Sequence, residues 1–276
     1  MSLFVSLQKL LPQHLLSRCV GAIAASEQPW IRVPFIRAFA RTYGVNMEEA
    51  ERTDLSDYRS FNDFFTRSLT PSARPIAEGA PILACPADGA VSQSGIIQNG
   101  ELLQAKGIRY SFGALADACA GPAFEGGSFL TVYLSPKDYH RVHLPATGRL
   151  IRTIAIPGAL FSVNGATEGE IEGLFARNER LVAEFETDFG KMLVILVGAL
   201  IVASIETVWD GPPSPYRATS ISKHDVPLEK GAEMGRFLLG STVILAFEKG
   251  AVTLDPKLEP GTTVRMGQAI GVICQE

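Results

Sequence analysis

The sequence is poor in the residues that form metal sites and disulfide frameworks. Its 276 residues include only four cysteines and four histidines. No two cysteines stand in a C-x-x-C pattern, and no histidine lies at a zinc-finger interval from a cysteine. We therefore expect four reduced thiols, as in a cytosolic protein, and no metal site.

An excess of positive charge and a long apolar run are also lacking. The formal net charge of −4 argues against a protein that binds nucleic acid. The apolar segment 192–205 is shorter than the about 20 residues that a membrane-spanning helix needs. Its Gly198 and its many β-branched residues favour two buried strands instead. The first residues lack the basic n-region of a secretory signal, so we expect none.

The first 45 residues differ from the rest in charge and in pattern. They contain five basic residues and one acidic residue, Glu27, which gives +4 within a chain of −4. Their apolar residues recur at helical spacing, and Pro12, Pro29 and Pro34 are expected to break the stretch into short helices. Basic amphipathic helices with Trp30 and several phenylalanines suit a membrane surface. The pattern alone equally allows a helical cap that packs on its own domain.

Beyond about residue 71 the pattern becomes that of a β protein. Gly261 and Gly267 supply the positive φ angles that tight turns need. We expect an α+β fold, with amphipathic helices over residues 1–70 and a β-rich, barrel-like or sandwich-like catalytic core over residues 71–276. The β-branched runs that predict its strands are residues 129–134, 150–156, 181–185, 192–197, 199–205, 242–247 and 272–274.

The four histidines fall into three settings. His14 lies in the first amphipathic stretch, and His224 lies in the polar segment 220–225, where we expect a solvated loop. His140 and His143 would share one face of a helix, whereas they would point to opposite faces of a strand. No carboxylate or cysteine pattern completes a metal site around them, so two hydrogen-bonded structural histidines remain an alternative.

Ser241 stands in a setting that permits unusual backbone chemistry. It follows Gly240, which has no side chain, so the Ser241 hydroxyl can approach the Gly240 carbonyl and attack it within a five-membered ring. Such an acyl shift needs a base for the hydroxyl and donors for the oxyanion. Asp88 and His143 could complete a triad with Ser241, although triads are recognised by geometry and Asp88-Gly89 is also a common turn dipeptide.

The string Leu239-Gly240-Ser241-Thr242 resembles the L-G-S-T processing motif of phosphatidylserine decarboxylases. The resemblance extends over nearly the whole chain. The string Y-H-R-V-H at 139–143 resembles the paired-histidine motif of the family, and P-A-D-G at 86–89 resembles its aspartate motif. Further similar stretches are S-F-N-D-F-F at 60–65, P-G-A-L-F-S-V-N at 157–164, L-F-A-R-N-E-R at 174–180 and E-M-G-R-F at 233–237.

The resemblance implies a proenzyme that cleaves itself between Gly240 and Ser241. A β chain of residues 1–240 and an α chain of residues 241–276 would remain together as a heterodimer. In this scheme Asp88 orients His143, His143 takes the proton of Ser241, and Ser241 attacks the carbonyl of Gly240. Elimination and hydrolysis then convert Ser241 into a covalent pyruvoyl group and release ammonia.

The resemblance also implies the reaction and the location. Phosphatidylserine would form a Schiff base with the pyruvoyl group, which acts as an electron sink while CO₂ departs, and would leave as phosphatidylethanolamine. His140 is the candidate acid that protonates the product, with His143 as the alternative. A substrate held in an anionic bilayer favours membrane contact by the first 45 residues, as a peripheral protein on the cytoplasmic side of the cell membrane.

Two other classes of protein remain open from the sequence. One is a serine hydrolase that uses Asp88, His143 and Ser241 on an external substrate, although no G-x-S-x-G elbow surrounds Ser241. The other is a lipid-binding protein without catalytic activity. Two chains under denaturing conditions would favour the lyase, whereas one chain fits both alternatives and an unprocessed lyase.

Overall fold

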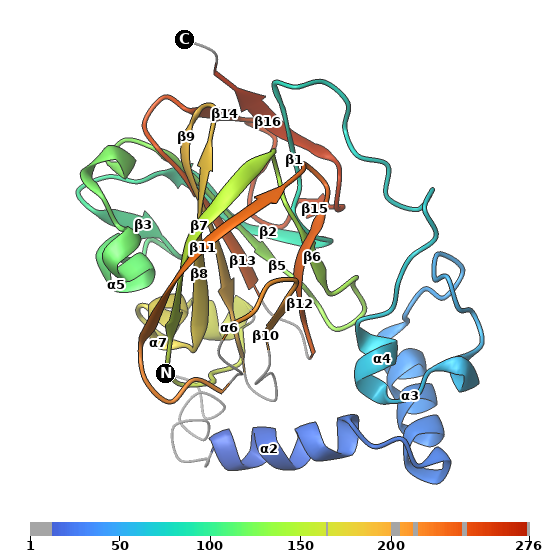
Figure 1. Ribbon diagram of the computed structural model, residues 1–276. Coiled ribbons are helices and arrows are strands. Elements are labelled where there is room, and N and C mark those ends of the chain that lie inside the picture. The colour runs from blue at the N-terminus through green and yellow to red at the C-terminus, as the bar shows by residue number, and fades with distance from the viewer. Residues whose placement is uncertain (1–12, 164, 200–204, 212–214, 239–241, 275–276) are drawn as a thin grey trace.

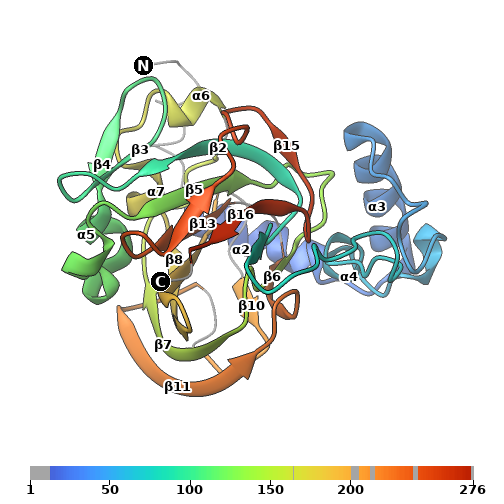
Figure 2. The same ribbon diagram turned by 90° about the horizontal axis from the view of Figure 1, so that it is seen from above.

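The computed structural model describes residues 13–163, 165–199, 205–211, 215–238 and 242–274. Figure 1 shows a body built on strands, with the first helices below it and to its right. Figure 2 shows helices α3 (Pro29–Tyr43) and α4 (Phe61–Phe65) set apart from that body. The α+β fold with a β-rich core is confirmed. The domain boundary at residue 70 stays a prediction.

The N-terminal helices begin and end where the local sequence favours it. Helix α2 (Gln13–Ala24) contains His14, and the short helix η1 (Leu55–Asp57) precedes α4. Pro29 opens α3 in its first turn, where the missing N–H has no helical partner, and Gly44 ends it at a φ of 64°. The expectation that Pro34 breaks this helix is wrong, because α3 continues through it. Packing of its apolar face offsets the lost hydrogen bond.

That apolar face of α3 packs against α4. Ile36, Phe61 and Phe64 are fully buried, and the rings of Phe35 and Phe61 stack with their centroids 4.4 Å apart. This cluster is separate from the two clusters of the body. A helical cap therefore accounts for much of the amphipathic pattern in α3.

One antiparallel sheet of eight strands forms the centre of the body. Its strand order is β11-β7-β8-β9-β13-β5-β2-β15. These strands are β2 (Gly89–Ile96), β5 (Ser128–Tyr133), β7 (Gly148–Ile156), β8 (Arg180–Thr187), β9 (Gly190–Val197), β11 (Ser220–Leu228), β13 (Thr242–Phe247) and β15 (Thr263–Val264). The strands expected at 129–134, 150–156, 181–185, 192–197 and 242–247 are thus confirmed.

The central strands are buried on both faces, which explains their continuous apolar sequences. In β9, Val194 and Leu196 face one core cluster, whereas Ile195 and Val197 face the other. Short helices cover the second face: α5 (Phe112–Ala116), η2 (Asp117–Cys119), η3 (Pro122–Phe124) and α7 (Leu174–Arg177). Helix α6 (Gly165–Glu168) precedes α7 and contributes no residue to this cluster.

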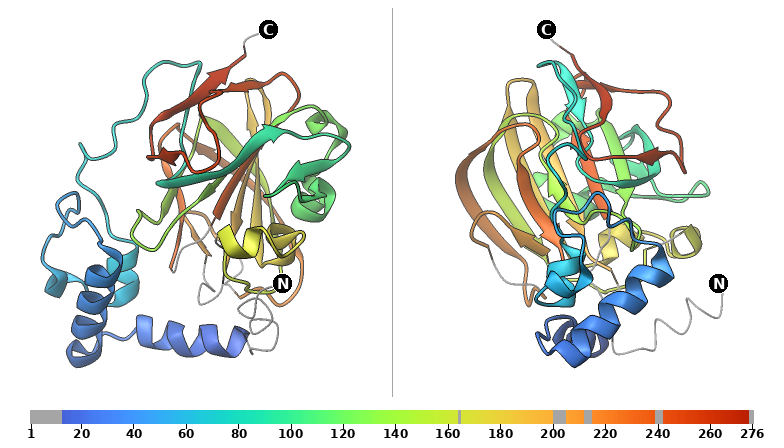
Figure 3. Two further views of the ribbon diagram at one scale, coloured as in Figure 1. Left: turned by 180° about the vertical axis from the view of Figure 1, so that it is seen from behind. Right: turned by 90° about the vertical axis from the view of Figure 1, so that its right-hand side faces the viewer.

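Small sheets pack on the first face. One has the order β1-β16-β14 and another β10-β12-β6, while β3 and β4 form a hairpin beside the body. Their bounds are β1 (Ile82–Ala84), β3 (Glu101–Leu103), β4 (Arg109–Ser111), β6 (Arg141–His143), β10 (Ile205–Thr207), β12 (Glu233–Phe237), β14 (Val252–Leu254) and β16 (Ala269–Ile273). Residues 66–81 run without regular structure from α4 along the body to β1 (Figure 3).

Two strand expectations need comment, and one expected loop is wrong. Of the predicted strand 199–205, residues 200–204 lie outside the described residues, and β10 begins only at Ile205. The predicted strand 272–274 overlaps β16, which ends at Ile273. His224 lies in β11 and not in a loop, and its Nε2 is 2.8 Å from the hydroxyl of Thr153. Among the described helices, none is both long enough and apolar enough to cross a bilayer.

Candidate active site

The predicted cleavage sequence lies between two well-anchored points. Leu239, Gly240 and Ser241 themselves lie outside the described residues. Before them, the backbone N–H of Phe237 donates to the carbonyl of His140 at 3.0 Å. After them, Thr242 pairs with Tyr133 of β5 on one side and with Val197 of β9 on the other. The cleavage sequence therefore connects the small sheet that contains β6 to the centre of the large sheet.

The same end of the large sheet contains Asp88. Ala90 of β2 pairs with Tyr133, which in turn pairs with Thr242, so Asp88 precedes a residue that is in register with the start of β13. The backbone N–H of His143 donates to the carbonyl of Pro86 at 2.8 Å. The structure thus brings the Asp88 segment, strand β6 and the start of β13 to one end of the body.

The hydrogen bonds of His143 define its tautomer. Its Nδ1 is 2.8 Å from the carbonyl oxygen of Gly231, which can only accept, so Nδ1 carries the proton. Its Nε2 is 3.0 Å from the hydroxyl of Tyr139 and therefore accepts from it. Burial lowers the pKa of His143, while the Gly231 carbonyl and the charges of Glu233 and Asp88 oppose that shift. The ring is neutral and presents a basic nitrogen, as a general base must.

The Asp88 carboxylate is held by other groups. Arg74 Nε donates to both of its oxygens, at 2.8 and 3.0 Å, and Arg74 Nη2 donates to one of them at 2.5 Å. The backbone N–H of Met266 donates to the other oxygen at 2.8 Å. The same guanidinium reaches Glu49 at 2.9 Å, which ties the N-terminal part to the body. Among the described residues, it is the Gly231 carbonyl that orients His143, so Asp88 acts on His143 through its charge.

His140 has a different environment from His143. Its side chain is fully buried, and its ring stacks on Phe65 with centroids 3.9 Å apart and planes 12° apart. Burial and, to a smaller extent, the charge of Arg67 lower its pKa to about 3, while the backbone of Pro136 opposes the shift. Neither ring nitrogen makes a hydrogen bond within the described part of the chain. The ring of His140 is therefore neutral.

Sequence reasoning missed three residues of this region. Arg74 stands in an irregular linker, and nothing local distinguished it from a solvated arginine. Tyr139 was part of the paired-histidine string, and its position before His140 was the available signal. Arg67 is only 3% exposed, yet two of its nitrogens have no hydrogen-bond partner among the described residues. Only the fold reveals these contacts, because each joins segments that are distant in the chain.

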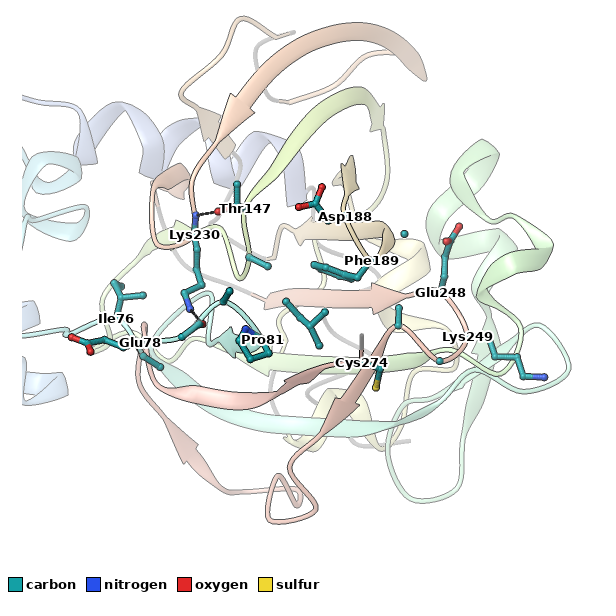
Figure 4. A pocket seen from close by; sticks show the side chains of 18 residues that line it. Ile76, Glu78, Pro81, Thr147, Asp188, Phe189, Lys230, Glu248, Lys249 and Cys274 are labelled. Carbon is teal, nitrogen blue, oxygen red and sulfur yellow. Dashed lines mark hydrogen bonds between the residues drawn. The ribbon is translucent and has the colours of Figure 1, made fainter. Parts of the chain in front are cut away.

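A cavity of about 1200 Å³ lies elsewhere in the described part of the chain. Figure 4 shows Phe189 near its centre, with Lys230 and Glu248 on opposite sides. Glu248 follows the last residue of β13, whereas the cleavage sequence precedes the first residue. A six-residue strand spans roughly 20 Å, so this cavity is at the wrong end of β13 to serve the cleavage site.

Comparison with known proteins gives a consistent result over the whole chain. The sequence model described as phosphatidylserine decarboxylase matches residues 61–272, and one described as PSD matches residues 3–44. A phosphatidylserine decarboxylase proenzyme of Polaromonas naphthalenivorans is 47% identical over 279 residues, which cover 98% of this chain and 96% of the relative.

Two further relatives have the same description. The protein of Acinetobacter baylyi is 49% identical, covering 98% of this chain and 95% of its own. That of Saccharophagus degradans is 50% identical, covering 97% and 96%. The family motifs at 86–89 and 139–143 lie at the end of the sheet where the L-G-S-T sequence leads into β13. The chain therefore belongs to the phosphatidylserine decarboxylase family.

Proposed function

We propose that this chain is a proenzyme that cleaves itself between Gly240 and Ser241 and then decarboxylates phosphatidylserine to phosphatidylethanolamine and CO₂. Its membership in the family is the observation that carries this proposal. The arrangement around the cleavage sequence supports it. Phe237 and Thr242 anchor the two flanks, and a neutral histidine with a basic Nε2 lies on the strand that pairs with β12.

Self-cleavage needs a base and a suitable peptide bond. The Ser241 hydroxyl attacks the carbonyl of Gly240, so that an ester replaces the amide bond and the nitrogen becomes a free amine. We assign the removal of the hydroxyl proton to Nε2 of His143, with the negative charge of Asp88 favouring the protonated ring that results. Elimination frees the Gly240 carboxylate, and hydrolysis of the remaining dehydroalanine releases ammonia and leaves the pyruvoyl group.

The two products of cleavage are expected to stay together. The small chain would contain β13, β14, β15 and β16. Strand β13 lies between β5 and β9 at the centre of the large sheet, and β16 pairs with β1. These partners belong to the large chain. Separation would break several ladders of backbone hydrogen bonds and expose strands that are buried on both faces, so the heterodimer is the stable product.

The surroundings fit a pyruvoyl group at position 241. When present, this group supplies a ketone and an electron sink for the carbon that loses CO₂. His140 is fully buried against Phe65, and its carbonyl accepts from the backbone N–H of Phe237, before the cleavage sequence. We assign the protonation of that carbon to His140, with His143 as the alternative. Since His140 is neutral, the donor is an imidazole N–H.

A carbonyl reagent tests the proposed chemistry. Phenylhydrazine reacts with ketones, so it should abolish the conversion of phosphatidylserine in vesicles by the processed protein, with a matching mass increase on the small chain alone. The two alternative functions provide no ketone, and therefore predict neither effect. The measurement combines release of CO₂ from carboxyl-labelled lipid with the masses of the separated chains. Full activity after exposure to the reagent would contradict the pyruvoyl mechanism.

We further propose that the N-terminal helices hold the protein on the membrane. Trp30 is 75% exposed and Ile23 is 49% exposed, and both lie close to the junction of α2 and α3. Exposed arginines, among them Arg37 and Arg41, add positive charge to the same helices. An apolar ridge with basic neighbours suits the interface of an anionic bilayer, which favours a peripheral position on the cytoplasmic side.

Charge reversal on α3 should weaken membrane binding. The double variant Arg37→Glu and Arg41→Glu should bind vesicles that contain phosphatidylserine at least roughly thirty-fold less tightly at low salt, because each basic residue near the surface contributes about 1 kcal/mol. Arg32 is left unchanged, since its guanidinium bonds to the carbonyls of Ser56 and Tyr58. Vesicle co-sedimentation measures the effect, and high salt should reduce the difference.

The control for this test carries the same change of charge elsewhere. Arg109 and Arg217 are exposed and lie outside the N-terminal helices, so the variant Arg109→Glu with Arg217→Glu should bind nearly as well as the wild type. Self-cleavage should be intact in both variants. An equal loss of binding in both would assign the effect to net charge and would refute attachment through α3.

A further inference from the structure

Arg67 is a buried cation without an acidic partner among the described residues. It follows α4 directly and is 3% exposed. Its Nη2 donates to the carbonyls of Lys137 and Asp138, at 3.0 and 3.3 Å. Its Nε and Nη1 have neither exposed surface nor a partner among the described residues. Burial lowers the pKa of Arg67, and an unpaired buried charge of this kind destabilises the fold. A bound anion would offset this charge and accept hydrogen bonds from the two unpartnered nitrogens.

His140 lies close to Arg67, and its ring nitrogens also lack hydrogen-bond partners among the described residues. It is fully buried, and it feels the charge of Arg67. Phe65 stacks on its ring, and the loop that Arg67 holds, at Lys137 and Asp138, leads directly into it. Arg67 offers two unpartnered N–H groups near this ring. One anion with several oxygens would satisfy both of these donors.

We propose that Arg67 binds the phosphodiester group of the phospholipid substrate, next to His140. The proposal rests on the function proposed above. The site adjoins the cleavage sequence, because the His140 carbonyl holds Phe237, three residues before Gly240. It also adjoins the N-terminal helices, because Phe65 belongs to α4. A lipid that enters from those helices would meet the site on its way to position 241.

The chemistry of the reaction favours the phosphodiester over the carboxylate as the ligand of Arg67. The substrate carboxylate loses its charge as CO₂ forms, so an arginine bound to it would stabilise the starting state more than the transition state. The phosphodiester keeps its charge throughout. Its presence beside Arg67 also offsets the positive charge that acts on His140, which makes the ring a better hydrogen-bond partner and proton carrier during turnover.

The site is closed in this structure by contacts of α4 and the residues that follow it with the segment around His140. Arg67 holds the loop at Lys137 and Asp138, and Arg141 Nε donates to the carbonyl of Thr66 at 2.9 Å. The cluster around α4 is separate from the two cores of the body. A small displacement of α4 from this loop would therefore open the site without disturbing the large sheet.

Arginine variants of the processed enzyme test the proposal with a soluble ligand. Glycerophosphoethanolamine has the phosphodiester and lacks the carboxylate, whereas free serine has the carboxylate and lacks the phosphodiester. Arg67→Met should weaken the binding of glycerophosphoethanolamine roughly tenfold to a hundredfold, as the loss of charged hydrogen bonds predicts. It should raise KM for short-chain phosphatidylserine similarly and change kcat by less than about threefold. Arg67→Lys should recover part of the binding.

Arg180 provides the matched control. It is also a buried arginine, but its donors are taken by the carbonyls of Leu115, Ala176, Asn178 and Ala114. Arg180→Lys should lower stability and leave the affinity for glycerophosphoethanolamine unchanged. Calorimetry measures that affinity without any turnover, so the site is tested even if the protein proves not to decarboxylate phosphatidylserine. Self-cleavage in the Arg67 variants is read separately from their two-chain pattern.

The possible outcomes separate clearly. Weaker binding of glycerophosphoethanolamine with unchanged binding of serine supports the site. Equal affinity in wild type and Arg67→Met overturns it, as does a fall in kcat at constant KM, which would make Arg67 a positioning residue for the loop of His140. Weakening limited to inorganic phosphate, with glycerophosphoethanolamine unaffected, would assign the site to free phosphate and would also refute the proposal.

Discussion

Replacing Ser241 with alanine should yield one folded chain of 29.7 kDa without decarboxylase activity. The hydroxyl is needed twice, first as the nucleophile and then as the oxygen that is eliminated, and alanine provides neither. Thr242 and the rest of β13 are unchanged in this variant, so the fold should be retained. Denaturing electrophoresis and a decarboxylation assay measure the two effects.

Other substitutions at position 241 should give intermediate rates of cleavage. Ser241→Cys retains a nucleophile whose thioester can eliminate, so it should cleave slowly and acquire some activity. Ser241→Thr can attack, but its extra methyl crowds the residue after Gly240 and remains on the product ketone. It should cleave poorly. Normal cleavage of Ser241→Ala would show that another residue, or a protease, cuts the chain.

Replacing His143 with alanine should block self-cleavage, whereas replacing His140 should not. His143→Ala removes the neutral ring whose Nε2 is free of a proton and which we assign as the base. Asp88→Ala should slow cleavage less completely, since Gly231 still orients the ring and only the supporting charge is lost. His140→Ala should give two chains with decarboxylation reduced by roughly a hundredfold or more, as the loss of a general acid predicts. Time courses of cleavage and of CO₂ release provide both measurements.

The backbone register makes this a demanding test. His143 pairs with Glu233, whereas the carbonyl of His140 bonds to Phe237, which is closer in the chain to Gly240. By its position along β12, His140 is the closer of the two histidines to the cleavage site. His143, however, is the histidine whose Nε2 is known to lack a proton and can act as the base. Tyr139→Phe frees Nε2 of His143 and serves as the matched control, because it leaves both histidines in place. If His140→Ala stays uncleaved while His143→Ala is cleaved normally, then His140 is the base for self-cleavage and His143 is the acid for decarboxylation.

Much of the core was predictable because its strands are apolar on both faces. Strand β13 has the predicted bounds of 242 and 247, since a β-branched run between turn residues leaves little choice of structure. Strand β11 was missed around His224 because it is an edge strand with alternating burial, polar residues and Pro227. Pro34 was wrongly expected to break the helix, because helix propensity does not include the packing of Phe35 and its neighbours on α4.

The residues of the candidate site could be predicted from the sequence, but most of their contacts could not. Motif resemblance named Asp88, His140 and His143, and the fold brings their segments to one end of the body. It did not predict that Arg74 would hold Asp88 or that Gly231 would orient His143. Arginine contacts and a carbonyl acceptor leave no periodic signal in the sequence. They arise only when distant segments pack together.

The mass of the small chain tests the central proposal most directly. The chain of residues 241–276 should carry a blocked, ketone-bearing first residue. It should be lighter than the same peptide with N-terminal serine by the mass of ammonia, about 17 mass units, because the amine is lost when the pyruvoyl group forms. Intact-mass spectrometry of the separated chains resolves this difference. A small chain that begins with a free serine amine would contradict the pyruvoyl assignment and would indicate simple proteolysis.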